Sequence, residues 1–159
     1  MKKALSKIIA TWFFSGLAPK APGTFGTLLS LIFVIPVAYY GGFTGMFLFG
    51  IAVSIAGYWA IKELTKDLNE KDLSMIVVDE TLGIIVTFIF VTPFLFHNMT
   101  YWWLYPLGFG LFRFFDICKM GLVKYYDDQN SEIGVILDDV FAGINSGLIL
   151  YVVCNFMLQ

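Results

Sequence analysis

Hydrophobic positions dominate the chain and occur in long uncharged runs separated by short polar segments. No charged residue falls between positions 25 and 61 or between 81 and 112. Such runs cannot form a solvated surface, whereas a helix that crosses a bilayer needs about 20 mostly apolar residues. The pattern therefore predicts an all-α, polytopic membrane helical bundle with about five spans, folded as a single domain over residues 1–159.

Polar and turn-forming residues set the predicted boundaries of the helices. Apolar positions recur at helical spacing over 5–17, a stretch too short to span and flanked by lysines, which predicts an N-terminal interfacial helix. The predicted spans cover 25–40, 43–61, 79–96, a stretch after the aromatic residues 101–103 that ends at 113–116, and 134–158. The third and fourth spans measure roughly 24 Å at about 1.5 Å per residue, which leaves open whether they cross fully or are re-entrant.

The distribution of charge predicts the orientation. All ten Lys and Arg residues lie in the N-terminal segment, in the 62–74 loop or in the 113–124 segment, and the twelve acidic residues fall on the same side. The positive-inside rule makes this side cytoplasmic, with the turns at 41–42 and 97–100 on the opposite side. Since no long apolar run precedes a small-residue cleavage site, we expect the N-terminal segment to be retained.

Composition and topology exclude several classes of function. The net charge of -2 offers no basic surface for a nucleic-acid backbone. His97 is expected on the side opposite the acids, which argues against a Ser-His-Asp site. Cys118 is followed six positions later by Lys124 rather than by an arginine, so a cysteine phosphatase is not expected. A disulfide between Cys118 and Cys154 is not expected either, because the two lie at different predicted depths.

Carboxylates mark one depth of the predicted bundle. Asp79 and Glu80 begin the third span, Asp116 ends the fourth, and Asp138 and Asp139 open the fifth. Converging acids need a counter-charge, and Mg²⁺ prefers carboxylate, water and phosphate oxygens. The alternative is that acids at helix N-termini only complement the helix dipole, although this does not suit Asp116 at a helix C-terminus.

Groups suited to a phosphate are predicted near the acids. Gly23 lets the backbone approach an anion at the start of the first span. The other groups supply positive charge or a hydroxyl donor: Lys20, Thr24, Arg113 and Lys119. Two simpler interpretations stay open, since Lys20 can be a lysine at the membrane interface and Arg113 can form only a local i, i+3 ion pair with Asp116.

Four segments together resemble the phosphatidylglycerophosphatase A family. They read Leu-Ala-Pro-Lys-Ala-Pro-Gly-Thr-Phe-Gly-Thr at 17–27, Val-Asp-Glu at 78–80, Arg-Phe-Phe-Asp-Ile-Cys-Lys at 113–119 and Gly-Val-Ile-Leu-Asp-Asp-Val-Phe-Ala-Gly at 134–143. They occur in the family's order, and the resemblance extends from about residue 6 to residue 152. One departure is Met120, where the family usually has proline after the lysine, and it bears on the geometry of that loop.

The resemblance implies hydrolysis of the terminal phosphate of phosphatidylglycerophosphate in a bacterial inner membrane, with magnesium as cofactor and the site facing the cytoplasm. It implies a phospholipid substrate held in the bilayer and no obligate protein partner. Our hypothesis is that the acids supply the magnesium ligands and one general base, and that the other groups bind the substrate phosphate. The expected catalytic residues are Asp79, Glu80, Asp116 and Asp139, with Asp138 as a further metal ligand.

Two alternatives remain at the level of sequence. In a non-enzymatic membrane protein, such as a scaffold or channel subunit, the carboxylates would only set the topology. In a phosphatase of phosphatidic acid or of a polyprenyl phosphate, the mechanism would be the same. Nothing identifiable in the chain reads the glycerol headgroup.

Overall fold

The fold is an all-helical bundle, as predicted. The computed structural model describes residues 2–69, 73–129 and 131–157, and the regular structure in these ranges is helical. The elements in order are α1 (Lys2–Ala10), the 3-10 turn η1 (Ser15–Leu17), α2 (Pro22–Pro36), the π-helical η2 (Val37–Gly41), α3 (Gly42–Thr65), α4 (Val78–Ile89), α5 (Thr92–Leu95), α6 (Leu104–Cys118), α7 (Leu122–Asp127) and α8 (Glu132–Met157). The predicted end of the last span, at residue 158, lies outside the described residues.

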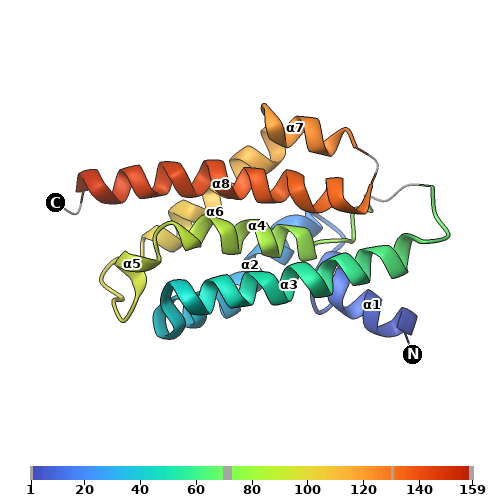
Figure 1. Cartoon of the computed structure of the whole chain (residues 1–159), viewed down its shortest axis with the longest axis horizontal. Helices are drawn as coiled ribbons and strands as arrows, with labels where there is room; N and C mark the ends of the chain where they lie inside the picture. The colour runs from blue at the N-terminus through green and yellow to red at the C-terminus, as the bar shows by residue number, and fades with distance from the viewer. Residues whose placement is uncertain (1, 70–72, 130, 158–159) are drawn as a thin grey trace.

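The short helix α4 forms the centre of the bundle. It packs against α2, α3, α6 and α8, which surround it in Figure 1. Nine of its twelve residues are buried, and these lie on all sides of the helix. A helix that is buried all round needs residues without charge all round, and α4 has them except in its first turn, where Asp79 and Glu80 lie; the hydroxyls of Thr81 and Thr87 bond to carbonyl oxygens one turn earlier.

Helices α4 and α8 approach each other closely through small residues. A Cβ on Gly83 would lie 2.7 Å from the Asp139 carbonyl oxygen, and a Cβ on Gly147 would lie 2.9 Å from the Thr87 carbonyl oxygen. A Cβ on Gly143 would collide with the Gly83 carbonyl oxygen. Because these contacts advance in the same direction along both helices, α4 and α8 run parallel, and the first turn of α4 lies beside the second turn of α8.

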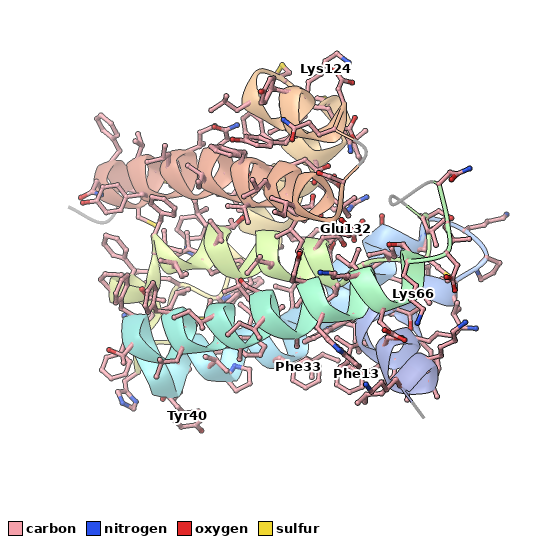
Figure 2. The ribbon with its side chains drawn as sticks, turned by 45° about the vertical axis from the view of Figure 1, so that its right-hand side comes forward. Phe13, Phe33, Tyr40, Lys66, Lys124 and Glu132 are labelled. Carbon is pink, nitrogen blue, oxygen red and sulfur yellow. The ribbon has the colours of Figure 1, made fainter. Side chains whose placement is uncertain are left out.

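The uncharged turns meet at the opposite end of the bundle. The His97 backbone N–H donates a hydrogen bond of 3.0 Å to the Tyr39 carbonyl oxygen. The His97 ring also contacts the rings of Tyr39, Tyr40 and Phe96. Figure 2 shows Tyr40 at this end and Lys66 and Glu132 at the other. The structure therefore separates His97 from the charged residues, as the sequence predicts.

The prediction of five spans is not confirmed. Two helical stretches of the described chain, 22–65 and Glu132–Met157, are long and apolar enough to cross a membrane. The first of them turns back on itself at Gly42 (Figure 1), whose φ is +54°. The predicted third span is interrupted, because Pro93 lies in the first turn of α5 and cannot continue the hydrogen bonding of α4. With 12 residues, α4 is about 18 Å long, well short of a bilayer core.

The predicted N-terminal helix is shorter than its apolar pattern suggested. Helix α1 ends at Ala10, and the next residues turn the chain through left-handed conformations at Trp12, Phe13 and Phe14, with φ of 42°, 54° and 69°. The Thr11 hydroxyl stabilises this turn by accepting a 3.1 Å hydrogen bond from the Phe14 backbone N–H. Bulky aromatic residues rarely adopt this conformation, so the sequence pattern gave no sign of it.

We predict that Gly143→Ala lowers the stability of the protein in detergent by about 1 to 3 kcal/mol, because the new methyl group must push α8 away from α4. The measurement is the thermal unfolding midpoint. Gly110→Ala is the matched control, since no atom lies within 4 Å of a Cβ at this position in α6. An equal effect of both substitutions would contradict the proposed role of the α4–α8 contact.

Candidate active site

A polar pocket lies at the end of the bundle where α2, α4 and α8 begin and α6 ends. Its volume is about 320 Å³. Three helix N-termini therefore direct the positive ends of their dipoles toward one region, which favours bound anions. The lining comprises Ala21, Pro22, Gly23, Ser74, Ile76, Asp79, Glu80, Arg113, Asp116, Ile117, Lys119, Val135, Asp138 and Asp139.

The structure brings all five predicted acids to this pocket. Among the described residues of the lining, the five carboxyl groups face two cationic side chains, Arg113 and Lys119, which gives these residues a formal charge of -3 when all are ionised. Concentrated negative charge away from water is costly unless it is paired. The lining therefore has the charge expected of a site for a cation.

Arg113 joins two elements of the site. Its Nη1 atom lies 2.6 Å from Asp116 Oδ2 on the same helix and 3.1 Å from Glu80 Oε1 on α4. The Arg113 side chain is only 16% exposed. The local ion pair with Asp116 is thus present, but Arg113 does more than anchor a loop, because it also links α6 to α4.

Glu80 is held from a third element as well. The Thr27 hydroxyl, one turn into α2, lies 3.1 Å from Glu80 Oε2 and donates to it. A Cβ on Gly23 would lie 2.8 Å from the same oxygen, so the first turn of α2 fits against Glu80 only because residue 23 is glycine. Both oxygens of Glu80 are therefore engaged, one by Arg113 and one by Thr27.

Lys119 is held between two carboxylates at the end of α6. Its Nζ atom lies 3.0 Å from Asp138 Oδ2 and also pairs with Asp127 on α7. Burial disfavours the charged form of Lys119, but the hydrogen bond to Asp127 and the charge of Asp138 outweigh this and raise the pKa of the ammonium above its ordinary value. Lys119 therefore stays positively charged at neutral pH.

Asp139 offers an oxygen to the pocket. Its side chain is only 4% exposed, and the Oδ1 atom is buried without a hydrogen-bond partner among the described residues. Within the described ranges, no three His, Cys, Asp or Glu side chains form a ready-made metal centre. Mg²⁺ commonly uses one or two carboxylates and takes its other ligands from water and phosphate. An unpaired buried carboxylate oxygen among other acids fits such a site.

Two predicted phosphate-binding residues do not line the pocket. Lys20 precedes the lining residue Ala21, but its side chain is exposed. Thr24 follows the lining residue Gly23 in the first turn of α2 and is half-buried. Their roles in phosphate binding stay predictions.

The sequence reasoning missed two residues of the site. Thr27 shares a helix face with Gly23 at i, i+4, and this spacing within the 17–27 segment could have singled it out. Asp127 lies in α7, a six-residue helix between the predicted fourth and fifth spans. No local pattern links Asp127 to Lys119, because the contact depends on how α7 folds back.

A hollow larger than the polar pocket is apolar and lies elsewhere. It has a volume of about 530 Å³ and lies between the 13–18 segment and the outer face of α2. Its lining contains no charged side chain, and Phe13 stacks on Phe33 nearby (Figure 2). The one polar side chain among the described lining residues of this hollow is that of Ser15, with no acid or base beside it, so the acid-lined pocket is the candidate active site.

Comparison with known families identifies the chain. The model of the phosphatidylglycerophosphatase A family matches residues 8–154. The chain belongs to this family. The match includes all four segments that resemble the family and every residue of the acid-lined pocket.

Related bacterial proteins carry two different names. A protein of Bacteroides thetaiotaomicron, provisionally named a phosphatidylinositol-3-phosphatase, is 35% identical over 93% of this chain and 92% of its own length. The phosphatidylglycerophosphatase A of Escherichia coli is 30% identical over 91% of this chain and 80% of its own length. The phosphatidylglycerophosphatase A of Haemophilus influenzae is 28% identical over 95% of this chain and 90% of its own length. No solved structure matches.

We predict that Arg113→Met destabilises the protein by about 3 kcal/mol or more, because Glu80 and Asp116 would stay buried without their shared cation. Chemical or thermal unfolding in detergent measures this loss. Lys124→Met is the matched control, since the pair between Lys124 and Asp128 is 65% and 62% exposed and such pairs contribute about 1 kcal/mol or less. Equal stability of the two variants would contradict the bridging role of Arg113.

Proposed function

We propose that the chain is a magnesium-dependent lipid phosphatase that hydrolyses phosphatidylglycerophosphate to phosphatidylglycerol and inorganic phosphate. Membership of the phosphatidylglycerophosphatase A family makes it a phosphoric monoester hydrolase and supports a role in phospholipid synthesis. The observation that carries the proposal is the pocket in which five carboxyl groups surround the cations Arg113 and Lys119 at the common end of three helices.

Magnesium fits the donor set of this pocket. Asp139, with its unpaired Oδ1, is our first ligand, and the neighbouring carboxylates are the candidates for the others: Asp79, Asp116, Asp138 and Glu80. The chemistry that the cation supplies there is neutralisation of phosphate charge and polarisation of the phosphoryl oxygens. The excess negative charge of the lining is the physical argument for this cofactor.

The side chains of the pocket divide the work of hydrolysis. Arg113 and Lys119 would bind the non-bridging oxygens of the terminal phosphate and stabilise the charge that develops on them. One of the catalytic carboxylates would take a proton from the attacking water while the water oxygen bonds to phosphorus. The bond between phosphorus and the glycerol oxygen then breaks, and that oxygen takes up the proton that the carboxylate accepted, which gives a free hydroxyl and restores the carboxylate.

The membrane assignment rests on the apolar helices and on the segregation of charge. The stretches 22–65 and Glu132–Met157 are candidates to cross the inner membrane. Helices α4 and α6, with the turn that joins them, form a hairpin. This turn lies at the same end of the bundle as Tyr39, because the His97 backbone N–H donates to the Tyr39 carbonyl oxygen. We propose that this hairpin inserts with them and that the pocket faces the cytoplasm, because the basic residues gather at that end. The acyl chains of the substrate would then stay in the bilayer, and no obligate protein partner is needed.

The headgroup is the least constrained part of the proposal. A phosphate monoester on a lipid is common to phosphatidylglycerophosphate, phosphatidylinositol 3-phosphate, phosphatidic acid and polyprenyl phosphates. The relative named for phosphatidylinositol 3-phosphate is 35% identical, against 28% and 30% for those named for phosphatidylglycerophosphate. This makes phosphatidylinositol 3-phosphate the second candidate substrate.

The purified protein in detergent is expected to release phosphate from phosphatidylglycerophosphate faster than from phosphatidylinositol 3-phosphate or phosphatidic acid. We expect the release to stop when a chelator replaces magnesium. Steady-state phosphate release with each lipid measures both expectations. A preference for phosphatidylinositol 3-phosphate would move the assignment to the second candidate, and no release from any lipid by folded protein would favour a non-enzymatic role.

We predict that Asp139→Asn lowers kcat about 100-fold or more, because it removes the charge of a lining carboxylate whose Oδ1 atom has no hydrogen-bond partner among the described residues. Added magnesium should raise the unfolding temperature of the wild type but not that of Asp139→Asn, since only a folded site that binds the ion gains stability from it. Asp128→Asn is the control, as Asp128 is exposed and lies outside the pocket lining. Full activity of Asp139→Asn would rule out its role as a metal ligand.

A further inference from the structure

We propose that Thr27 is a positioning residue that fixes Arg113 for phosphate binding by holding Glu80. The inference rests on the proposed function only in that the pocket binds a phosphate group. Thr27 does not line the pocket, and its hydroxyl contacts two lining residues, Glu80 through its carboxylate and Gly23 through its backbone carbonyl oxygen. No motif or charge pattern in the sequence had assigned a role to it.

The first step is the anchoring of the Thr27 hydroxyl. Thr27 is fully buried, and its Oγ1 atom lies 2.9 Å from the Gly23 carbonyl oxygen one turn earlier in α2. The same atom lies 3.1 Å from Glu80 Oε2. The hydroxyl has one proton for these two acceptors, and we assign it to Glu80 because a carboxylate is a stronger acceptor than a backbone carbonyl group.

The second step is the orientation of Glu80. Thr27 engages Oε2 and Arg113 engages Oε1, while Gly23 closes the space beside the carboxylate. Rotation of the carboxyl group would break either the hydroxyl contact or the ion pair, and movement toward α2 is blocked by its backbone. Glu80 therefore has one favourable position, set from the α2 side.

The third step is the position of Arg113. The guanidinium lies between Glu80 on α4 and Asp116 on α6, and both partners are at most 14% exposed. Without the Thr27 hydroxyl, Glu80 gains freedom to turn, and Arg113 can follow it or pair with Asp116 alone. A cation displaced by about 1 Å binds a tetrahedral phosphate less well and stabilises the transition state less.

A matched residue one turn deeper separates positioning from packing. Ser30 lies in the same interface between α2 and α4, where its hydroxyl contacts the Gly26 carbonyl oxygen at 2.8 Å and the Thr81 hydroxyl at 2.7 Å. It is fully buried like Thr27, but its partners carry no charge and lie outside the pocket lining. Ser30→Ala therefore loses comparable buried contacts without affecting Glu80.

The test compares Thr27→Val, Thr27→Ser and Ser30→Ala, with inorganic phosphate as a binding probe and lipid hydrolysis as the kinetic readout. We expect Thr27→Val to weaken phosphate binding and to lower kcat about tenfold, the effect of one hydrogen bond to a charged group. Thr27→Ser should restore both to within about twofold, and Ser30→Ala should leave both near the wild-type values. Thermal unfolding checks that each variant is folded, and Thr27→Ala replaces Thr27→Val if the latter is not.

A double-mutant cycle tests the route through Glu80. In the Glu80→Gln background, Thr27→Val should cause little further loss, because residues that act through one another are not additive. Three outcomes would overturn the inference. One is that the effects of Thr27→Val and Glu80→Gln add fully in the double variant. The others are that Thr27→Val leaves phosphate binding and kcat unchanged, or that Thr27→Ser fails to restore them. If the wild type binds inorganic phosphate but hydrolyses no lipid, the proposed function fails, and the phosphate arm still decides the role of Thr27.

Discussion

The close contact between α4 and α8 is the constraint on which the site depends. Gly83 and Gly143 let the two helices approach until backbone oxygens of one lie against the other. Because the helices run parallel, this contact sets the first turn of α4 beside the second turn of α8, and with them the acids at 79–80 and 138–139. In a membrane, where lipid is as apolar as a leucine side chain, such close packing of small residues is a main source of helix association. The same contact thus stabilises the bundle and assembles the pocket.

The acids of the pocket cost stability that the rest of the fold has to supply. Buried carboxylates repel one another, and the ion pairs of Arg113 and Lys119 offset only part of that repulsion. The helix N-termini around the pocket contribute partial positive charge. Proteins keep such costly arrangements mainly at functional sites, where a cation and an anionic substrate complete the balance of charge. The pocket is therefore pre-organised for a charged ligand.

The distribution of polarity along the bundle suits an amphiphilic substrate. The end with the pocket carries the acids and bases, whereas the opposite end is formed by aromatic turns around His97 and Tyr39. Between them, the outward faces of α2, α3 and α8 expose large apolar side chains, as Figure 2 shows for the whole bundle. A lipid can thus present its phosphate to one end while its chains remain beside apolar helix surfaces. A free sugar phosphate would use only the polar half of this arrangement.

The sequence by itself determined the helical class, the positions of the turns at 41–42 and 97–100, and the gathering of acids at one end, because apolar runs and charge positions are local properties. The sequence pattern predicted a third span, 79–96, that is longer than α4, although Pro93 indicates a break there. It gave no sign of the left-handed turn at Trp12. Only the tertiary structure decided which acid pairs with which cation. Thr27 reaches Glu80 across 53 positions of sequence, and Lys119 meets both Asp127 and Asp138. These pairings depend on how each helix is rotated about its own axis, and contacts between distant segments, above all those of the glycines in α4 and α8, set that rotation.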